Sequence, residues 1–196
     1  MLVDQPVQRF AQRNRSGTSD DLAAFVRHMG QPEVYVTTSL GLIGAGLIAG
    51  RPQVAKAGGR AGVSVALAAA LELSLKGIIG RARPDSGLGA SHFDPFSGSE
   101  SLPSGHSALS FALATSLAGD IRPTWARVGL YGLAAATALS RVNDDRHWLS
   151  DITAGALIGI TSAKLVGGKW QVLGLRPPGV LVARTGTPVF GWSFSF

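Results

Sequence analysis

Long stretches of small apolar residues with almost no charge constrain the fold of this chain more than any other feature of its sequence. Two of them run from residue 34 to 50 and from residue 61 to 80. Charged residues make up 15% of the chain and hydrophobic residues 45%, mostly Ala, Gly, Leu and Val. Small side chains let helices approach closely, which favours helix association in lipid. We therefore expect an all-α protein whose helices form a transmembrane bundle.

The length of the chain suits one domain. A chain of 196 residues can bury one sizeable core, and its composition marks no second one. We divide the expected domain, residues 1–196, into an N-terminal surface segment (1–32), a helical core (33–168) and a tail (169–196). The mean hydropathy is only +0.23, and the apolar stretches are interrupted, so a buried soluble bundle remains an alternative.

Cap and stop signals place the individual elements. Thr18 to Asp21 offer N-cap residues ahead of apolar residues at helical spacing up to Met29, which predicts a short amphipathic helix on the surface. About five core helices are expected, over residues 34–50, 61–80, 104–118, 125–139 and 149–166. Residues 84–102 are rich in Gly, Ser, Pro and Asp and predict a loop of functional length. Alternating apolar residues around 185–188 predict a C-terminal β-hairpin.

The charge balance narrows the classes of partner. A net charge of +6 is compatible with nucleic acid, an anionic membrane face or a phosphorylated substrate. The basic residues are scattered in ones and twos without aromatic stacking motifs, so we expect no nucleic acid partner. The chain has no cysteine, which excludes disulfides, thiolate catalysis and Cys-based zinc sites.

The first cluster of candidate functional residues ends the apolar stretch at residue 80. Lys76 and Arg83 are seven residues apart, which places them near the same helix face, and Pro84 stops the helix. The alternative interpretation is structural, because cations at a helix end satisfy its dipole. Glu72, four residues before Lys76, offers an intrahelical ion pair.

The second cluster is Pro103-Ser104-Gly105-His106 at the start of a predicted helix. Free backbone amides at a helix N-terminus, a glycine that permits close approach and a serine hydroxyl can together bind a phosphate. His106 is placed to donate or accept a proton. Alone, the same four residues also suit a turn in which Ser104 is only the N-cap.

The third cluster contains Arg141, His147 and Asp151. His147 and Asp151 are four apart, so on a helix the carboxylate can accept a hydrogen bond from the imidazole and orient it as a nucleophile. The guanidinium of Arg141 suits two phosphate oxygens. By itself, a helical His–Asp pair is more often a structural hydrogen bond, and residues 144–146 have the composition of a solvated turn.

Together the three clusters resemble the three-part signature of the type 2 phosphatidic acid phosphatase family, and every signature position from Lys76 to Asp151 is filled. The superfamily also contains bacterial acid phosphatases and vanadium-dependent haloperoxidases. The resemblance implies a metal-independent phosphatase that hydrolyses a lipid phosphate or diphosphate through a phosphohistidine. Expected partners are a phosphorylated lipid and the membrane, and no cofactor or metal is implied.

The resemblance also implies a role for each matching residue. His147 would attack phosphorus, oriented by Asp151, and His106 would protonate the leaving oxygen. The remaining residues would bind the phosphoryl oxygens: Lys76, Arg83, Arg141, Ser104 and the amide of Gly105. Fixed cations and helix-end amides can neutralise the charge of a phosphoryl group without Mg²⁺.

Four alternative functions remain open from the sequence. A soluble acid phosphatase of broad specificity could use the same pocket, and a vanadium haloperoxidase uses a similar anion pocket but a more elaborate site. A lipid-binding protein with a vestigial site would need the cations but not His106, His147 and Asp151. A metal site is disfavoured because three cations in one pocket repel a divalent ion.

The distribution of basic residues predicts the membrane orientation. Arg51, Lys56 and Arg60 fall in a predicted turn, and Arg122 and Arg127 in the next turn on that side, so this side is expected to be cytoplasmic. The clusters then face the extracytoplasmic side of a bacterial-type inner membrane. The start of the chain would lie there too, which requires an export signal or an upstream helix. Residues 1–10 lack the apolar core of a signal peptide.

Overall fold

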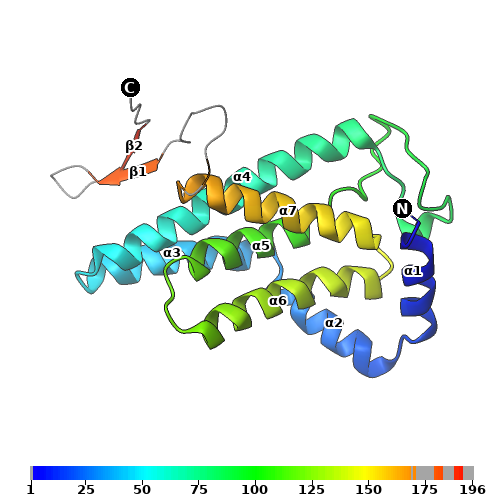
Figure 1. The fold of residues 1–196 in the computed structure, drawn as a ribbon, viewed down its shortest axis with the longest axis horizontal. Coiled ribbons are helices and arrows are strands. Elements are labelled where there is room, and N and C mark those ends of the chain that lie inside the picture. The colour runs from blue at the N-terminus through cyan, green and yellow to red at the C-terminus, as the bar shows by residue number, and fades with distance from the viewer. Residues whose placement is uncertain (1, 169, 171–178, 183–187, 192–196) are drawn as a thin grey trace.

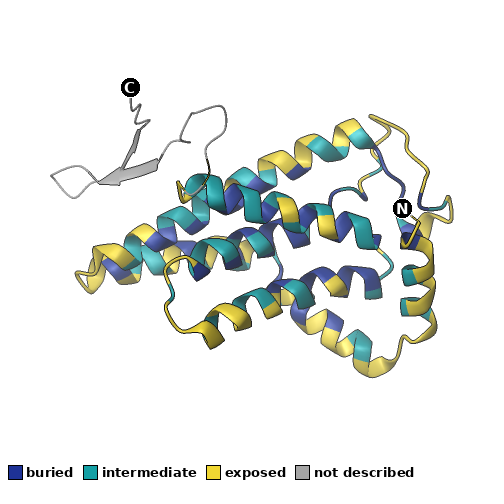
Figure 2. Cartoon of the chain, in the orientation of Figure 1, coloured by how far each residue is buried: buried dark blue, intermediate teal, exposed yellow. Residues whose placement is uncertain are grey.

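The computed structural model describes residues 2–168, 170, 179–182 and 188–191, which are mostly helical (Figure 1). The helices are α1 (Asp4–Arg13), α2 (Gly17–Met29), α3 (Pro32–Ile48), α4 (Pro52–Ile79), α5 (Gly105–Ala118), α6 (Thr124–Asn143) and α7 (Leu149–Val166), with a short 3-10 helix, η1 (Pro84–Ser86). Helix α5 contacts α3, α4, α6 and α7, and Figure 2 shows it among the most buried elements. The predicted helical bundle is confirmed.

Helix α4 is longer than the sequence analysis predicted. A basic turn was expected over residues 51–60, but the helix begins at Pro52 and includes Lys56 and Arg60. Proline suits the first helical position because its φ is preset and its missing N–H has no helical partner there. The 28 residues of α4 extend about 42 Å, at about 1.5 Å per residue.

Two helices of the described chain, α4 and α7, are long and apolar enough to cross a membrane. Large apolar side chains are also exposed along the outer helix faces, which suits a lipid environment better than water. In α3, α4, α6 and α7 they include Leu40, Leu47, Ile48, Leu71, Leu73, Ile78, Leu133, Leu139 and Leu157. The exposed apolar side chains are therefore spread over several helices.

Two glycines let α5 and α7 pack with their backbones in close contact. A Cβ atom at Gly155 would overlap the carbonyl oxygen of Ser104, and one at Gly159 would overlap that of Ala108. Glycines four residues apart lie on one helix face and permit this approach. The two helices also meet at the start of each, where the Ser104 amide donates to the Asp151 carbonyl at 3.1 Å and where two of the predicted clusters lie.

The N-terminal segment adds two helices to one end of the bundle. The amphipathic helix expected after residue 18 is confirmed as α2, which packs on α6, whereas α1 was not predicted. Helix α1 contacts α6 and α7. The side-chain amide of Gln12 donates to the carbonyls of Val142 and Asn143, both at 3.1 Å. These contacts place α1 beside the segment that joins α6 to α7.

In the tail, the described residues include two short strands, β1 (Gly179–Val182) and β2 (Pro188–Gly191), paired antiparallel. The residues that would connect them, 183–187, lie outside the described part. The predicted hairpin as a unit therefore stays a prediction.

Candidate active site

The three predicted clusters meet at one end of the bundle. The end of α4, the start of α5, the end of α6 and the segment before α7 surround a pocket of about 220 Å³. Six of the predicted site residues line it: Lys76, Arg83, Gly105, His106, Arg141 and His147. The other two, Ser104 and Asp151, are completely buried. Ser104 directly precedes the lining residue Gly105, and Asp151 lies 3.8 Å from the ring of His147.

The pocket gathers more positive than negative charge. Lys76 pairs with Glu72 at 3.1 Å, as the structural interpretation of the sequence expected. Arg141 pairs with Asp144 at 2.9 Å, yet its buried Nε has no hydrogen-bond partner among the described residues. No ion pair to Arg83 is formed within the described part of the chain. Three cations around one lining carboxylate favour an anionic ligand.

His147 is held in one tautomer. Its Nδ1 lies 2.7 Å from the carbonyl oxygen of Ser101. A carbonyl oxygen can only accept, so Nδ1 carries the hydrogen and the neutral ring has its lone pair on Nε2. Burial lowers the pKa of His147. The neighbouring Asp151 and the Ser101 carbonyl raise it, but they offset the effect of burial only in part. The neutral ring is the form that can act as a nucleophile.

Asp151 contacts His147 differently from the sequence prediction. The sequence analysis treated His147 and Asp151 as a helical pair, although it predicted the helix itself over residues 149–166. Helix α7 does begin at Leu149, with Trp148 as N-cap, so His147 lies just before it. The Asp151 carboxylate lies 3.8 Å from Nδ1, too far for a hydrogen bond. It accepts from the Trp148 amide at 2.8 Å and from the Ser101 hydroxyl at 2.6 Å. Asp151 therefore holds Ser101, whose carbonyl orients the imidazole.

A buried arginine supports this arrangement from behind. The side chain of Arg81 is completely buried, and it donates to Asp151 at 2.5 Å and to Asp4 at 2.8 Å. Asp4 belongs to α1 and also accepts from the backbone amide of Ser150 at 2.9 Å. Burial by itself would raise the pKa of Asp4, but the hydrogen bonds from Arg81 and Ser150 outweigh it and lower that pKa.

The sequence analysis assigned no role to Arg81, Asp4 or Ser101. Arg81 had a local signal, because it is a third cation at the predicted helix end, two residues before Arg83. Asp4 had no such local signal, because its partner Arg81 is 77 residues away in the chain. Ser101 lies at the end of a polar loop in which several serines have the same local composition.

The start of α5 has polar atoms without partners. The hydroxyl of Ser104 and the Nε2 of His106 are buried, and neither forms a hydrogen bond within the described residues. Ser104 directly precedes α5 but makes no side-chain cap bond. A Cβ atom at Gly105 would lie 2.8 Å from a Glu72 oxygen, so only glycine fits there without displacing that carboxylate. Unpaired polar atoms beside a helix N-terminus suit phosphate oxygens.

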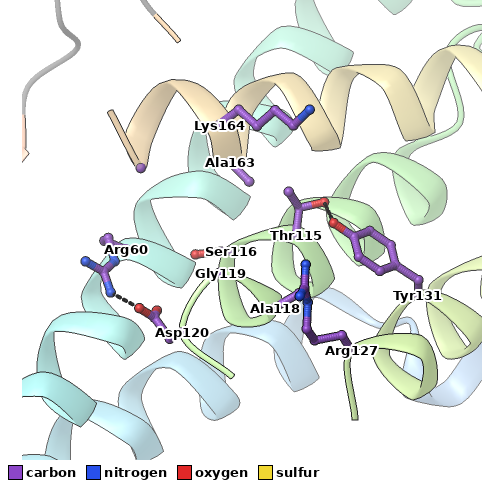
Figure 3. A pocket seen from close by; sticks show the side chains of 11 residues that line it. Arg60, Thr115, Ser116, Ala118, Gly119, Asp120, Arg127, Tyr131, Ala163 and Lys164 are labelled. Carbon is purple, nitrogen blue, oxygen red and sulfur yellow. Dashed lines mark hydrogen bonds and ion pairs between the residues drawn. The ribbon is translucent and has the colours of Figure 1, made fainter. Parts of the chain in front are cut away.

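A second pocket, of about 350 Å³, lies at the opposite end of the bundle (Figure 3). Arg60 pairs with Asp120 across it, and the Tyr131 hydroxyl donates to Thr115 at 3.2 Å. Its lining residues include two further cations, Arg127 and Lys164, but no histidine. The residues to which the sequence analysis assigned the chemistry therefore line the smaller pocket beside His147, not this one.

Comparisons with known proteins cover the part of the chain that contains this pocket. A family model described as the PAP2 superfamily matches residues 57–171, which include every predicted site residue. A stretch of 93 residues is 39% identical to a lipid A 1-phosphatase of Porphyromonas gingivalis. The match covers 46% of this chain and 18% of that protein, so this chain corresponds to a small part of its relative.

Two solved structures share the fold. The crystal structure of LpxE from Aquifex aeolicus matches with a TM-score of 0.65 and 21% identity, over 82% of this chain and 92% of that one. The transmembrane PAP2-type phosphatidylglycerolphosphate phosphatase of Bacillus subtilis matches with a TM-score of 0.68 and 22% identity. This match covers 86% of this chain and 84% of that one. At these identities the likeness concerns the fold alone.

Replacing Arg81 tests whether its ion pairs hold the site together. In Arg81→Gln, the carboxylates of Asp4 and Asp151 lose their charged partner while buried, which should lower the free energy of unfolding by about 3–5 kcal/mol. The control is Arg122→Gln, because Arg122 is exposed. This substitution should change the free energy of unfolding by less than about 0.5 kcal/mol. Denaturant unfolding in detergent measures both, and equal stability of the two variants would contradict the structural role.

Proposed function

Because the chain belongs to the PAP2 superfamily, we propose that it hydrolyses a lipid phosphate or diphosphate through a phosphohistidine at His147, without a metal ion. The family match confirms the membership expected from the sequence. The observation that carries the proposal is the neutral His147, held through Nδ1 by Ser101 in a pocket with three cations. A nucleophile beside an anion-binding pocket is what phosphoryl transfer to protein requires.

In the first step, the Nε2 lone pair of His147 attacks phosphorus. Lys76, Arg83 and Arg141 bind the phosphoryl oxygens, where the Ser104 hydroxyl and the Gly105 amide complete the contacts. The new N–P bond forms as the P–O bond to the lipid breaks, and His106 transfers its proton to the leaving oxygen. A bound phosphate favours the protonated form of His106 because of its opposite charge.

In the second step, water hydrolyses the phosphohistidine. His106, now neutral, accepts a proton from the water as its oxygen attacks phosphorus. The N–P bond breaks, the electron pair returns to Nε2 of His147, and inorganic phosphate leaves. The same cations stabilise the charge on the equatorial oxygens in both steps.

A lipid substrate is favoured over a soluble ester. Apolar side chains are exposed on several helices of the bundle, and α4 and α7 are long enough to span a bilayer. The names of two similar proteins specify lipid A and phosphatidylglycerolphosphate as substrates. The soluble acid phosphatase alternative leaves the exposed apolar surface without a role.

Activity measurements test the proposal. His147→Ala should abolish phosphate release from phosphatidate and polyprenyl diphosphate, and His106→Ala should lower kcat by about 10²–10⁴-fold. His28→Ala is the matched control, since His28 is exposed in α2. Wild-type activity should persist in excess chelator. A wild-type rate in His147→Ala, or a loss in chelator that one metal ion restores, would contradict the mechanism.

The lowered pKa of His147 has a measurable consequence. A lowered pKa means that the neutral, nucleophilic ring persists to a lower pH than an ordinary histidine, whose pKa is about 6.5. In ¹⁵N NMR of labelled protein in detergent, the His147 ring, assigned with His147→Gln, should titrate below this value. Titration at or above pH 6.5 would show that burial does not control its protonation.

For the orientation, we propose that the site faces the extracytoplasmic side. The opposite end of the bundle carries Arg51, Lys56, Arg60 and Arg127, and basic residues mark the cytoplasmic side. A protease site inserted in the loop near residue 98 should be cleaved by protease added outside intact spheroplasts. Cleavage only after lysis would show that the site faces the cytoplasm.

A further inference from the structure

A pocket of about 360 Å³ adjoins the phosphate-binding pocket and has four arginines in its lining. It is lined by Arg15, Arg27, Arg141, Asp144 and Arg146. Arg141 also lines the pocket that contains His147, so one guanidinium belongs to both. We name this pocket of about 360 Å³ the arginine pocket.

We propose that the arginine pocket binds a second phosphate of the substrate, while the first phosphate reacts at His147. The inference rests on the proposed function and narrows its substrate class to lipids with two phosphates. The second phosphate is either the distal half of a diphosphate or a separate phosphate on the same headgroup.

The charges in the arginine pocket are only partly compensated. Asp144 is its one lining carboxylate, and it pairs with both Arg27 at 2.7 Å and Arg141 at 2.9 Å. The side chains of Asp144 and Arg141 are each only 11% exposed. A guanidinium has five N–H donors, so one shared carboxylate leaves most of these donors available. Arg141 itself has a buried Nε without a partner among the described residues.

The other two arginines are tied to carboxylates outside the pocket lining. Arg15 pairs with Asp20 at 2.6 Å, and Arg146 pairs with Asp85 at 2.8 Å. All four of these side chains are about 40–50% exposed, and exposed ion pairs of this kind contribute little to stability. Such weak pairs can be exchanged for contacts with a phosphate, which guanidinium groups bind through two parallel hydrogen bonds.

The position of the arginine pocket is set by elements outside the catalytic clusters. Arg27 lies in the last turn of α2, and Arg15 directly precedes the N-cap of that helix. Helix α2 packs on α6, where the Thr137 hydroxyl donates to the carbonyl of Val26 at 3.3 Å. The N-terminal segment thereby brings two arginines next to Arg141. A purely structural role needs only the pair between Arg27 and Asp144, not four arginines around one space.

Matched substrates test the inference through turnover. Three lipids with the same chain are compared: a monophosphate, a diphosphate, and a headgroup with two separate phosphates. Wild-type kcat/KM should be at least tenfold higher for one of the two-phosphate lipids, and which one identifies the source of the second phosphate. Arg27→Gln and Arg146→Gln should lower kcat/KM for that lipid at least tenfold more than for the monophosphate. Arg127→Gln, at the other end of the bundle, is the control.

Two results would overturn the inference while leaving the proposed function intact. One is an equal loss of kcat/KM for all three lipids in Arg27→Gln, and the other is a wild-type kcat/KM that does not differ among the three lipids. Absence of phosphate release from every lipid would instead refute the proposed function. Binding to His147→Ala protein separates the two cases without turnover. That variant should bind the preferred two-phosphate lipid at least tenfold more tightly than the monophosphate, and equal binding would overturn the inference.

Discussion

The geometry of the site depends on the buried guanidinium of Arg81. It donates to Asp4, Asp151, Ser150 and the carbonyl of Ala90, so all of its nitrogens are hydrogen-bonded. Burying an ion costs several kcal/mol, which is offset only when the partners are well placed and every donor is used. Arg81 meets this condition, and it thereby joins α1, the polar loop and the first turn of α7.

The contrast between this network and the pocket in front of it has a functional meaning. Behind His147, Arg81, Asp151 and Ser101 satisfy one another and fix the imidazole. In front of it, Arg141 and Ser104 keep buried polar atoms without partners in the described chain. Catalysis by fixed charges requires groups that are already oriented before the substrate binds. The satisfied network holds these groups in place, and under the proposed function the unsatisfied atoms are where a phosphoryl group would gain its contacts.

Much of this organisation could be predicted from the sequence, and the rest could not for physical reasons. Lys76, His106 and Arg141 were predicted to converge, and they line one pocket. The start of α4 was misplaced because Pro52 reads as a helix stop, although it is equally suited to the first helical position. The acceptor for His147 was missed because Ser101 acts through its backbone carbonyl, which any residue type could provide. The pairs of Arg81 with Asp4 and Asp151 could not be predicted either, because the partners are 77 and 70 residues apart and leave no local sequence pattern.

A direct test of the central claim is to look for the phosphate on His147 itself. Enzyme mixed with a ³²P-labelled lipid phosphate and quenched in alkali within milliseconds should carry label that is stable in base and lost in acid, as expected of a phosphohistidine. Peptide mass spectrometry should then locate the modification on His147 of the wild-type protein. Continued turnover with no label on this residue at any quench time, or label on another residue, would contradict the account.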